Sequence, residues 1–345
     1  MKPLVARALA VLLLLSALAP GAGAGVEADR AALLQLAASV WKIEVQRAQG
    51  GFSLGSGVAV SPDLVLTNCH VTRDASAVFV LRGGRRWRAE AQAVDAEHDL
   101  CLLRVPGLAA RAVALGSSRA LWPGNPVWAF GYTGGMELQH TRGQVVALHR
   151  LDGAHVVQSS NAFTSGASGG GLFDEQMRLV GILTFRLRGG SAHYFSAPIE
   201  WLLPLLDGSS SPFVPVQPLD AERRAYWQLA PAAQPNFLRA AVFERERRWD
   251  ELEALAFNWT RADADDPQPW YLHGLALSGL QRWTESQRAL ERSVQLEPTW
   301  QQAWFHLGLV NMRQGQFDRA RQARGTLEGL NAELASELDR AIDGQ

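Results

Sequence analysis

Residues 55–71 read GSGVAVSPDLVLTNCHV, and this stretch decides the fold class. Two short apolar runs, Gly57–Val60 and Leu64–Thr67, stand on either side of a turn, and His70 follows the second run. Apolar runs of this length, bounded by Gly, Pro, Asp or Asn, are typical of β-strands and not of helices. The stretch therefore predicts two neighbouring strands, the second of which ends at a histidine.

The same pattern extends from Val40 to about Leu206. Short apolar or alternating runs follow one another there, separated by Gly, Asp and Asn. Many short strands with frequent turns predict a barrel or a sandwich. The chain has 345 residues, of which 47% are hydrophobic, so it is long enough for about two domains with sizeable cores.

Composition excludes several classes of partner. The formal net charge is −1 at pH 7, so the chain has no long-range field to attract nucleic acid or an anionic membrane. Its histidines at 140, 149 and 155 lack the spacing of metal ligands. We therefore expect no nucleic-acid partner, no metal and no cofactor, and look for function in a local site.

Residues 1–24 have the layout of a secretory signal peptide. Lys2 and Arg7 precede an apolar run, Ala8–Leu18, and small residues at 22–24 complete the pattern. The apolar run is shorter than the ~20 residues needed to cross a bilayer. We expect export to the periplasm or the medium, with no stable membrane insertion after the signal is removed.

A break in periodicity divides the rest of the chain. Residues 207–219 are rich in Gly, Ser and Pro, which predicts a linker. The apolar pattern becomes helical beyond it. We therefore expect a β domain over residues 34–206, a linker over 207–219 and an α-helical domain over 220–345.

The helical part repeats with a period of 34 residues, which is the tetratricopeptide period. Three pairs of positions share this spacing: Trp270 with Trp304, Gly274 with Gly308, and Trp283 with Phe317. The sequence from Trp270 to Pro298 resembles one tetratricopeptide repeat, and a second follows it. Trp249 lies one period before Trp283, which predicts a degenerate first repeat over about 233–266.

Two roles for these repeats remain open at this point. Stacked helix pairs form a curved array whose concave face receives a peptide, so the domain is expected to bind a protein partner. In that case, removing it at the linker would leave cleavage of a small peptide intact. The alternative is that so short an array packs on the β domain as a brace.

Three residues at strand boundaries form a candidate for nucleophilic catalysis. His70 follows one strand, Asp99 opens the apolar run Leu100–Leu103, and Ser168 lies in the glycine-rich stretch Thr164–Gly171. Acyl transfer by a serine needs a nucleophile, a base that takes its proton and an acid that holds the base. Each residue alone is modest evidence, but the order His, Asp, Ser strengthens the case.

The motifs GSGVAV, TNCHV, DLCLL and GASGG resemble those of trypsin-like peptidases of the HtrA/Deg type, over Val40–Leu206. This resemblance implies a chymotrypsin-like double β-barrel and a serine endopeptidase acting on proteins or peptides. It implies that Ser168 is the nucleophile, His70 the general base and Asp99 its orienting partner. The backbone N–H groups of Gly166 and Ser168 would form the oxyanion hole.

Asp95 competes with Asp99 for the role of the acid. Asp95 precedes Ala and Glu, whereas Asp99 precedes an apolar strand as in the motif, so Asp99 is preferred. The glycines of the nucleophile turn have a physical reason to be glycine, because a turn that aims two N–H groups inward leaves little room for side chains.

The resemblance places the specificity pocket at Phe163 and at the stretch 193–197. Within that stretch Phe195, Ser196 and Ala197 are the expected contacts, and His193 and Tyr194 precede them. No carboxylate is evident at the base of the pocket, so cleavage after Arg or Lys is not indicated. A small or medium apolar side chain is expected.

The chain departs from the HtrA pattern in two ways. Repeats follow where that family usually carries PDZ domains, so its trimeric, peptide-activated regulation is not assumed. Cys69 and Cys101, the only cysteines, lie close to His70 and Asp99, and either a disulfide or two buried thiols fits. A rival function is a catalytically idle scaffold that binds proteins through the repeats.

Overall fold

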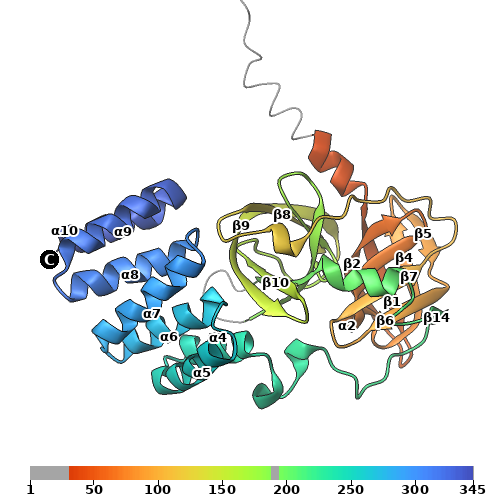
Figure 1. Cartoon of the computed structure of the whole chain (residues 1–345). Helices are drawn as coiled ribbons and strands as arrows, with labels where there is room; N and C mark the ends of the chain where they lie inside the picture. Colours follow the sequence, from red (N-terminus) through yellow and green to blue (C-terminus); the bar gives the residue numbers. More distant parts are fainter. Residues whose placement is uncertain (1–30, 188–193, 345) are drawn as a thin grey trace, which may run out of the picture.

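The structure is a computed structural model that describes residues 31–187 and 194–344. The expected signal segment, residues 1–24, and His193 of the expected pocket lie outside these described residues. A β-rich part and a helical part lie side by side, and the segment from about residue 207 to 235 runs between them (Figure 1).

The first β unit is an antiparallel sheet in the order β14-β6-β7-β3-β2-β1-β4-β5. Its core is apolar, with Ile43, Val45 and Val80 fully buried. A short helix, α2 (Cys69–Thr72), follows β3. The strands are β1 (Val40–Arg47), β2 (Phe52–Ser61), β3 (Leu64–Asn68), β4 (Ala75–Arg82), β5 (Arg85–Arg88), β6 (Ala91–Asp95), β7 (Leu100–Arg104) and β14 (Val214–Pro215).

The second β unit is a closed barrel. Its strands are β8 (Pro126–Thr133), β9 (Glu137–Leu151), β10 (Ala154–Ser159), β11 (Gly171–Phe173), β12 (Leu179–Arg186) and β13 (Tyr194–Pro198). A double barrel was expected, but the pairing of the described strands closes only this one. The first sheet ends at β5, whose three arginines put charge on the free edge, and a charged edge resists further pairing.

One apolar cluster joins the two β units. Val58, Leu66 and Leu100 of the first unit pack in the same cluster as Phe130 and Ile182 of the second. Burial of these side chains fixes the units against each other, because apolar area removed from water stabilises the contact. The C-terminal end of β3, the N-terminal end of β7 and the turn before β11 lie beside this apolar cluster.

The expected linker, residues 207–219, is fastened to the first β unit. Val214 in β14 pairs with Gln92 in β6, and the Gln92 side chain donates to the Gln217 carbonyl at 2.8 Å. Leu219 N–H donates to the Arg73 carbonyl at 2.7 Å. The Gly, Ser and Pro residues break helical periodicity, as expected. Short polar turns of this composition also suit an edge strand that runs along the surface of the first β unit.

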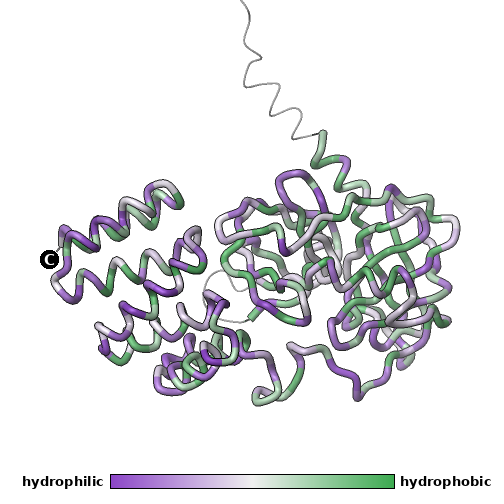
Figure 2. The backbone as a smooth tube through the Cα atoms, viewed as in Figure 1, coloured by the Kyte–Doolittle hydropathy of each residue, from purple (hydrophilic) through white to green (hydrophobic). Residues whose placement is uncertain are grey.

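The helical part is a stack of antiparallel helices in which consecutive helices are neighbours (Figure 1). Hydrophobic and hydrophilic residues alternate along these helices (Figure 2). The helices are α4 (Asn236–Arg245), α5 (Trp249–Ala262), α6 (Pro267–Gly279), α7 (Trp283–Leu296), α8 (Gln301–Arg313), α9 (Phe317–Leu330) and α10 (Ala332–Asp343).

Residues one period apart make the same contacts in this stack. The indole N–H of Trp270 donates to the Ala264 carbonyl at 2.9 Å, and that of Trp304 donates to the Pro298 carbonyl at 2.8 Å. Each bond reaches back the same distance along the chain. These tryptophans therefore hold the turn before their own helix, which is a packing role.

The helical part also packs on the barrel. The His149 ring of β9 stacks on Phe237 of α4 with centroids 4.4 Å apart, and Gln268 Nε2 lies 2.6 Å from His149 Nδ1. Arg150 and Asp263 form an ion pair at 3.3 Å. These contacts give the brace interpretation a structural basis.

Candidate active site

The end of β3 places His70 against β7. The Asn68 side chain donates to the Asp99 carbonyl at 3.0 Å and to Thr184 Oγ1 at 3.2 Å, so it joins both β units beneath the site. Cys69 and Cys101 are joined by a disulfide, with Cα atoms 4.9 Å apart. The two residues before His70 are thus tied to Asp99 and to the strand that follows it.

His70 and Asp99 face each other. The Nδ1 atom of His70 lies 2.6 Å from Asp99 Oδ2, and the backbone N–H of His70 donates to Asp99 Oδ1 at 2.8 Å. Asp99 is only 1% exposed and has a φ of 61°, which turns its side chain back toward the histidine. A carboxylate at Nδ1 leaves the other ring nitrogen, Nε2, to act as the base.

The turn that carries Ser168 is held by its backbone. Ser56 N–H donates to the Ser168 carbonyl at 2.8 Å, and Gly169 N–H donates to the Leu183 carbonyl at 2.9 Å. Gly169 has a φ of 85°, and a Cβ there would collide with the carbonyl of Ser56. The turn therefore leaves no room for a side chain at Gly169, which is the reason for glycine that was expected from the sequence.

The Ser168 hydroxyl points to a carbonyl in this conformation. Its Oγ donates to the Thr184 carbonyl at 3.4 Å, and within the described residues it makes no hydrogen bond with His70. Hydrogen bonds of catalytic groups are often long or unmade without substrate.

Two backbone donors of this turn are available for a substrate. Ala167 N–H donates to the Thr164 carbonyl at 3.1 Å, whereas among the described residues no protein acceptor pairs with the N–H of Gly166 or Ser168. Gly166 has a φ of 95°, and a Cβ there would crowd the Tyr132 carbonyl. Unpaired N–H groups beside a nucleophile are the donors that an oxyanion requires.

Asp95, the competing acid, has a histidine of its own. Its Oδ2 lies 2.7 Å from His98 Nδ1, and His98 Nε2 lies 3.1 Å from Asp152 Oδ2 of the barrel. Trp201 stacks on the His98 ring at 4.0 Å. Burial alone would lower the pKa of His98, but the hydrogen bonds and charges of Asp95 and Asp152 outweigh burial and raise this pKa above its usual 6.5.

We expect the contacts of His98 with Asp95 and Asp152 to stabilise the fold mainly at low pH. Because the folded-state pKa of His98 is raised, its contribution is fully present below the ordinary pKa of about 6.5 and is lost as pH rises through the folded value. The unfolding midpoint of His98→Gln should therefore lie furthest below that of wild type near pH 5, with the gap narrowing above pH 7. A gap that widens with pH would contradict the assignment.

The expected specificity residues divide into two groups. Phe163 lines a cavity of about 10 Å³ next to Ala167, the residue before Ser168. Phe195 instead stacks on Phe185 at 4.8 Å, and Ser196 and Ala197 are fully buried in the barrel sheet. Only Phe163 therefore borders this space, which is too small for a large side chain.

Sequence reasoning missed three residues at the site: Asn68, Thr184 and Trp227. Asn68 lies within the TNCHV motif, whose polar residue before the cysteine was a usable signal. The indole N–H of Trp227 donates to Asp99 Oδ2 at 3.1 Å. Trp227 falls inside the range assigned to the helical domain, and no local pattern connects it to Asp99.

The described residues contain no group of three or more His, Cys, Asp or Glu side chains arranged to hold a metal ion. The groups that the site does bring together are a hydroxyl, an imidazole and a carboxylate. A serine with a histidine–aspartate pair and two free N–H donors is suited to acyl transfer.

Comparison with known proteins finds matches over the β part. Residues 55–182 match the family described as "Trypsin-like peptidase domain". A "Probable periplasmic serine endoprotease DegP-like" of Halomonas elongata is 32% identical over 164 residues, which are 45% of this chain and 35% of that protein. One from Pseudomonas putida is 36% identical over 157 residues, covering 43% of this chain and 33% of that protein.

A solved structure, "HtrA-type protease AlgW with tripeptide", is 30% identical with a TM-score of 0.47, and the match covers 51% of this chain and 62% of that one. The chain spans about a third of the length of the curated relatives it matches. The helical part lies beyond the family match, which ends at residue 182. Residues 55–182 are thus similar to trypsin-like peptidase domains, and DegP-like serine endoproteases are among the proteins that the chain resembles.

Proposed function

We propose that the chain is an exported serine endopeptidase that hydrolyses peptide bonds through Ser168, His70 and Asp99. The observation that carries this proposal is the buried Asp99 carboxylate, which holds the ring and the backbone of His70 at 2.6 and 2.8 Å. A carboxylate taken out of water in this way is costly unless its partners are fixed. Asp99 lies beside a histidine and near the turn that carries Ser168. A role in catalysis would explain why this unfavourable buried charge is kept.

The reaction follows from the positions of the groups. Ser168 Oγ attacks the carbonyl carbon of the substrate while its proton passes to His70 Nε2. Asp99 accepts the hydrogen bond from Nδ1–H, which fixes the tautomer and stabilises the imidazolium. The N–H groups of Gly166 and Ser168 bind the oxyanion. The imidazolium then gives its proton to the leaving amine, and water attacks the acyl-enzyme by the reverse proton path.

We propose that the substrates are proteins or peptides with a small apolar side chain before the cleaved bond. The small cavity beside Ala167 and Phe163 supports a small side chain. Cavity volume limits the residue that enters, because overpacking of a well-packed space is unfavourable.

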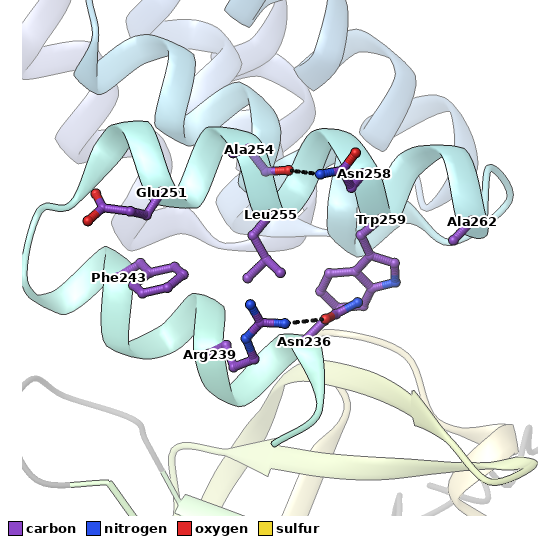
Figure 3. Close-up of a pocket in the computed structure, with 9 residues that line it drawn as sticks. All are labelled: Asn236, Arg239, Phe243, Glu251, Ala254, Leu255, Asn258, Trp259 and Ala262. Carbon is purple, nitrogen blue, oxygen red and sulfur yellow. Dashed lines mark hydrogen bonds between the residues drawn. The ribbon is translucent and has the colours of Figure 1, made fainter. Parts of the chain in front are cut away.

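We also propose that the helical part is a tetratricopeptide-like array that engages a polypeptide. The 34-residue period and the matching bonds of Trp270 and Trp304 support the repeat assignment. A groove of about 560 Å³ lies between α4 and α5 (Figure 3). Phe243, Leu255 and Trp259 supply its apolar surface, and the polar side chains at its rim are those of Asn236, Arg239, Glu251 and Asn258.

We place the protein outside the cytoplasm. The signal pattern of residues 1–24 and the disulfide between Cys69 and Cys101 support this location, because disulfides persist in oxidising compartments. The DegP-like relatives are named as periplasmic. In the part of the chain that the structure describes, every helix is too short or too polar to cross a membrane.

One experiment tests both activities. Wild-type protein is expected to cleave an unfolded protein and a short apolar peptide. Leu255→Asp puts a charge in the groove and should slow cleavage of the unfolded protein several-fold while leaving hydrolysis of the short peptide unchanged. The control Phe257→Asp, on the other side of α5 against His273, should change neither rate.

The outcomes separate the two proposals. Wild-type protein that cleaves neither substrate would contradict the peptidase function and favour the idle scaffold. Equal effects of Leu255→Asp and Phe257→Asp would contradict engagement through the groove and favour a bracing role for the helices.

A further inference from the structure

We propose that Trp227 is a positioning residue of the peptidase, which donates a hydrogen bond to the catalytic carboxylate of Asp99 from outside the matched peptidase domain. This inference rests on the proposed function of the triad. Trp227 lies far beyond residue 182, where the family match ends, in the segment that leads to the helices. The active site would therefore be completed by the C-terminal half of the chain.

Three hydrogen bonds, two between backbone groups and one from a side chain, bring this segment to the triad. The Arg73 carbonyl, close after His70, accepts the N–H of Leu219 at 2.7 Å. An Arg73 guanidinium nitrogen donates to the Arg223 carbonyl at 2.9 Å. The Glu97 carbonyl, just before Asp99, accepts the N–H of Tyr226 at 2.9 Å. The segment is thus held by residues that flank both members of the His–Asp pair.

The Trp227 ring has three defined partners. Its Nε1–H donates to Asp99 Oδ2 at 3.1 Å. Its plane stacks on Phe185, with centroids 5.0 Å apart and planes 12° from parallel. It meets the His70 ring edge to face at 5.5 Å and 87°. The indole therefore has one position, in which stacking fixes its plane and the N–H reaches the carboxylate.

The donor has an electrostatic consequence because Asp99 is buried. The other donors to this carboxylate among the described residues are the backbone and Nδ1 of His70. Tyr226 is the other titratable group that faces Asp99: burial, and then the charge of Asp99, raises the pKa of Tyr226 well above its usual 10, so it stays neutral. An N–H from Trp227 shares the negative charge of Oδ2, which would otherwise act on the imidazole proton alone at that oxygen.

Removing this donor should have two effects with definite signs. The carboxylate would keep more of its charge and would attract the imidazolium more strongly, so His70 would take up a proton at a higher pH. The His70 ring and the Asp99 carboxylate would also be held less rigidly. The two groups would then spend a smaller fraction of time in the arrangement that the reaction requires. A merely structural tryptophan would change stability without moving the protonation of His70.

Trp227→Phe is the direct test, because it keeps an aromatic ring against Phe185 and removes only the N–H and the second ring. We expect the rate of labelling of Ser168 by a fluorophosphonate to fall about 10-fold at neutral pH. The midpoint of the acidic limb of the rate–pH profile should move to higher pH. The matched control is Trp122→Phe, which changes a tryptophan that is 50% exposed and lies away from the triad, and it should match wild type in both.

Two further measurements keep the proposal falsifiable if the variant folds poorly or the wild type does not react. Proton NMR titration of the His70 ring in the full-length protein follows the same midpoint without any catalysis. Phe185→Leu removes the ring that supports the indole and should shift the midpoint upward by less than Trp227→Phe. An unlabelled wild type would overturn the proposed peptidase function. A His70 midpoint that is the same in wild type and Trp227→Phe would overturn the role of Trp227.

Discussion

Replacing Ser168 by alanine is expected to lower kcat/KM for peptide hydrolysis by about 10³-fold or more, with no loss of folded protein. The substitution removes the attacking oxygen. The Oγ of Ser168 makes one weak bond at 3.4 Å to Thr184, so its loss costs little stability. Steady-state kinetics on a short apolar peptide measure the effect, and circular dichroism checks the fold.

A matched control lies in the same turn. Ser165 is exposed, and Ser165→Ala makes the same chemical change three residues before the nucleophile. This variant should retain activity within about two-fold of wild type. A Ser168→Ala protein that still hydrolysed the peptide at the wild-type rate would show that another residue is the nucleophile.

The second large effect is expected for Asp99→Asn, which should reduce kcat/KM by roughly 10³-fold to 10⁴-fold. An amide is nearly the same size as the carboxylate, but it lacks the charge that stabilises the imidazolium. It also fits the wrong tautomer of His70, because an NH₂ group at Nδ1 would leave the proton on Nε2. The pH dependence of the residual rate measures the change in the base.

Asp95→Asn is the matched comparison, since Asp95 is the acid that the sequence alone leaves as a competitor. In the structure Asp95 faces His98 at 2.7 Å and not His70. Asp95→Asn should therefore change stability at low pH but leave the peptidase rate within a few-fold of wild type. Equal losses for the two variants would contradict the assignment of Asp99.

The motifs could single out the three proposed triad residues because each of them is marked by local backbone structure. His70 lies in the short helix α2 directly after β3, where a strand ending at the histidine was expected. Asp99 directly precedes β7, and the turn of Ser168 has glycines at positive φ. Strand ends and glycine turns are visible in a sequence. The antiparallel pairing of β3 with β7 then brings the first two residues together.

The parts that sequence reasoning missed depend on long-range contacts. Residues 207–219 contain the Gly, Ser and Pro of a linker, but their hydrogen bonds go to β6 and Arg73, which lie more than a hundred residues away in sequence. Trp227 reaches Asp99 only because these hydrogen bonds fix the course of the segment that precedes it. Composition reports local flexibility, not the partner of an edge strand.

The course of this segment also changes the result that we expect for a chain truncated at the linker. A cut within Ser209–Pro218 was expected to leave cleavage of a small peptide intact, because the β domain was thought to carry its complete site. Such a cut removes β14 and Trp227 as well as the helices. A fall in small-peptide hydrolysis after that cut would therefore follow from the active site itself and would not by itself identify a brace.

The most direct measurement of the central claim is covalent labelling of the purified, mature protein with a fluorophosphonate, followed by mass spectrometry of the digested product. An active serine nucleophile should carry one adduct, and the modified peptide should place it on Ser168. Labelling should disappear in Ser168→Ala and persist in Ser165→Ala. Wild-type protein that is folded but takes up no label at neutral pH, or that carries the label on another serine, would contradict the account.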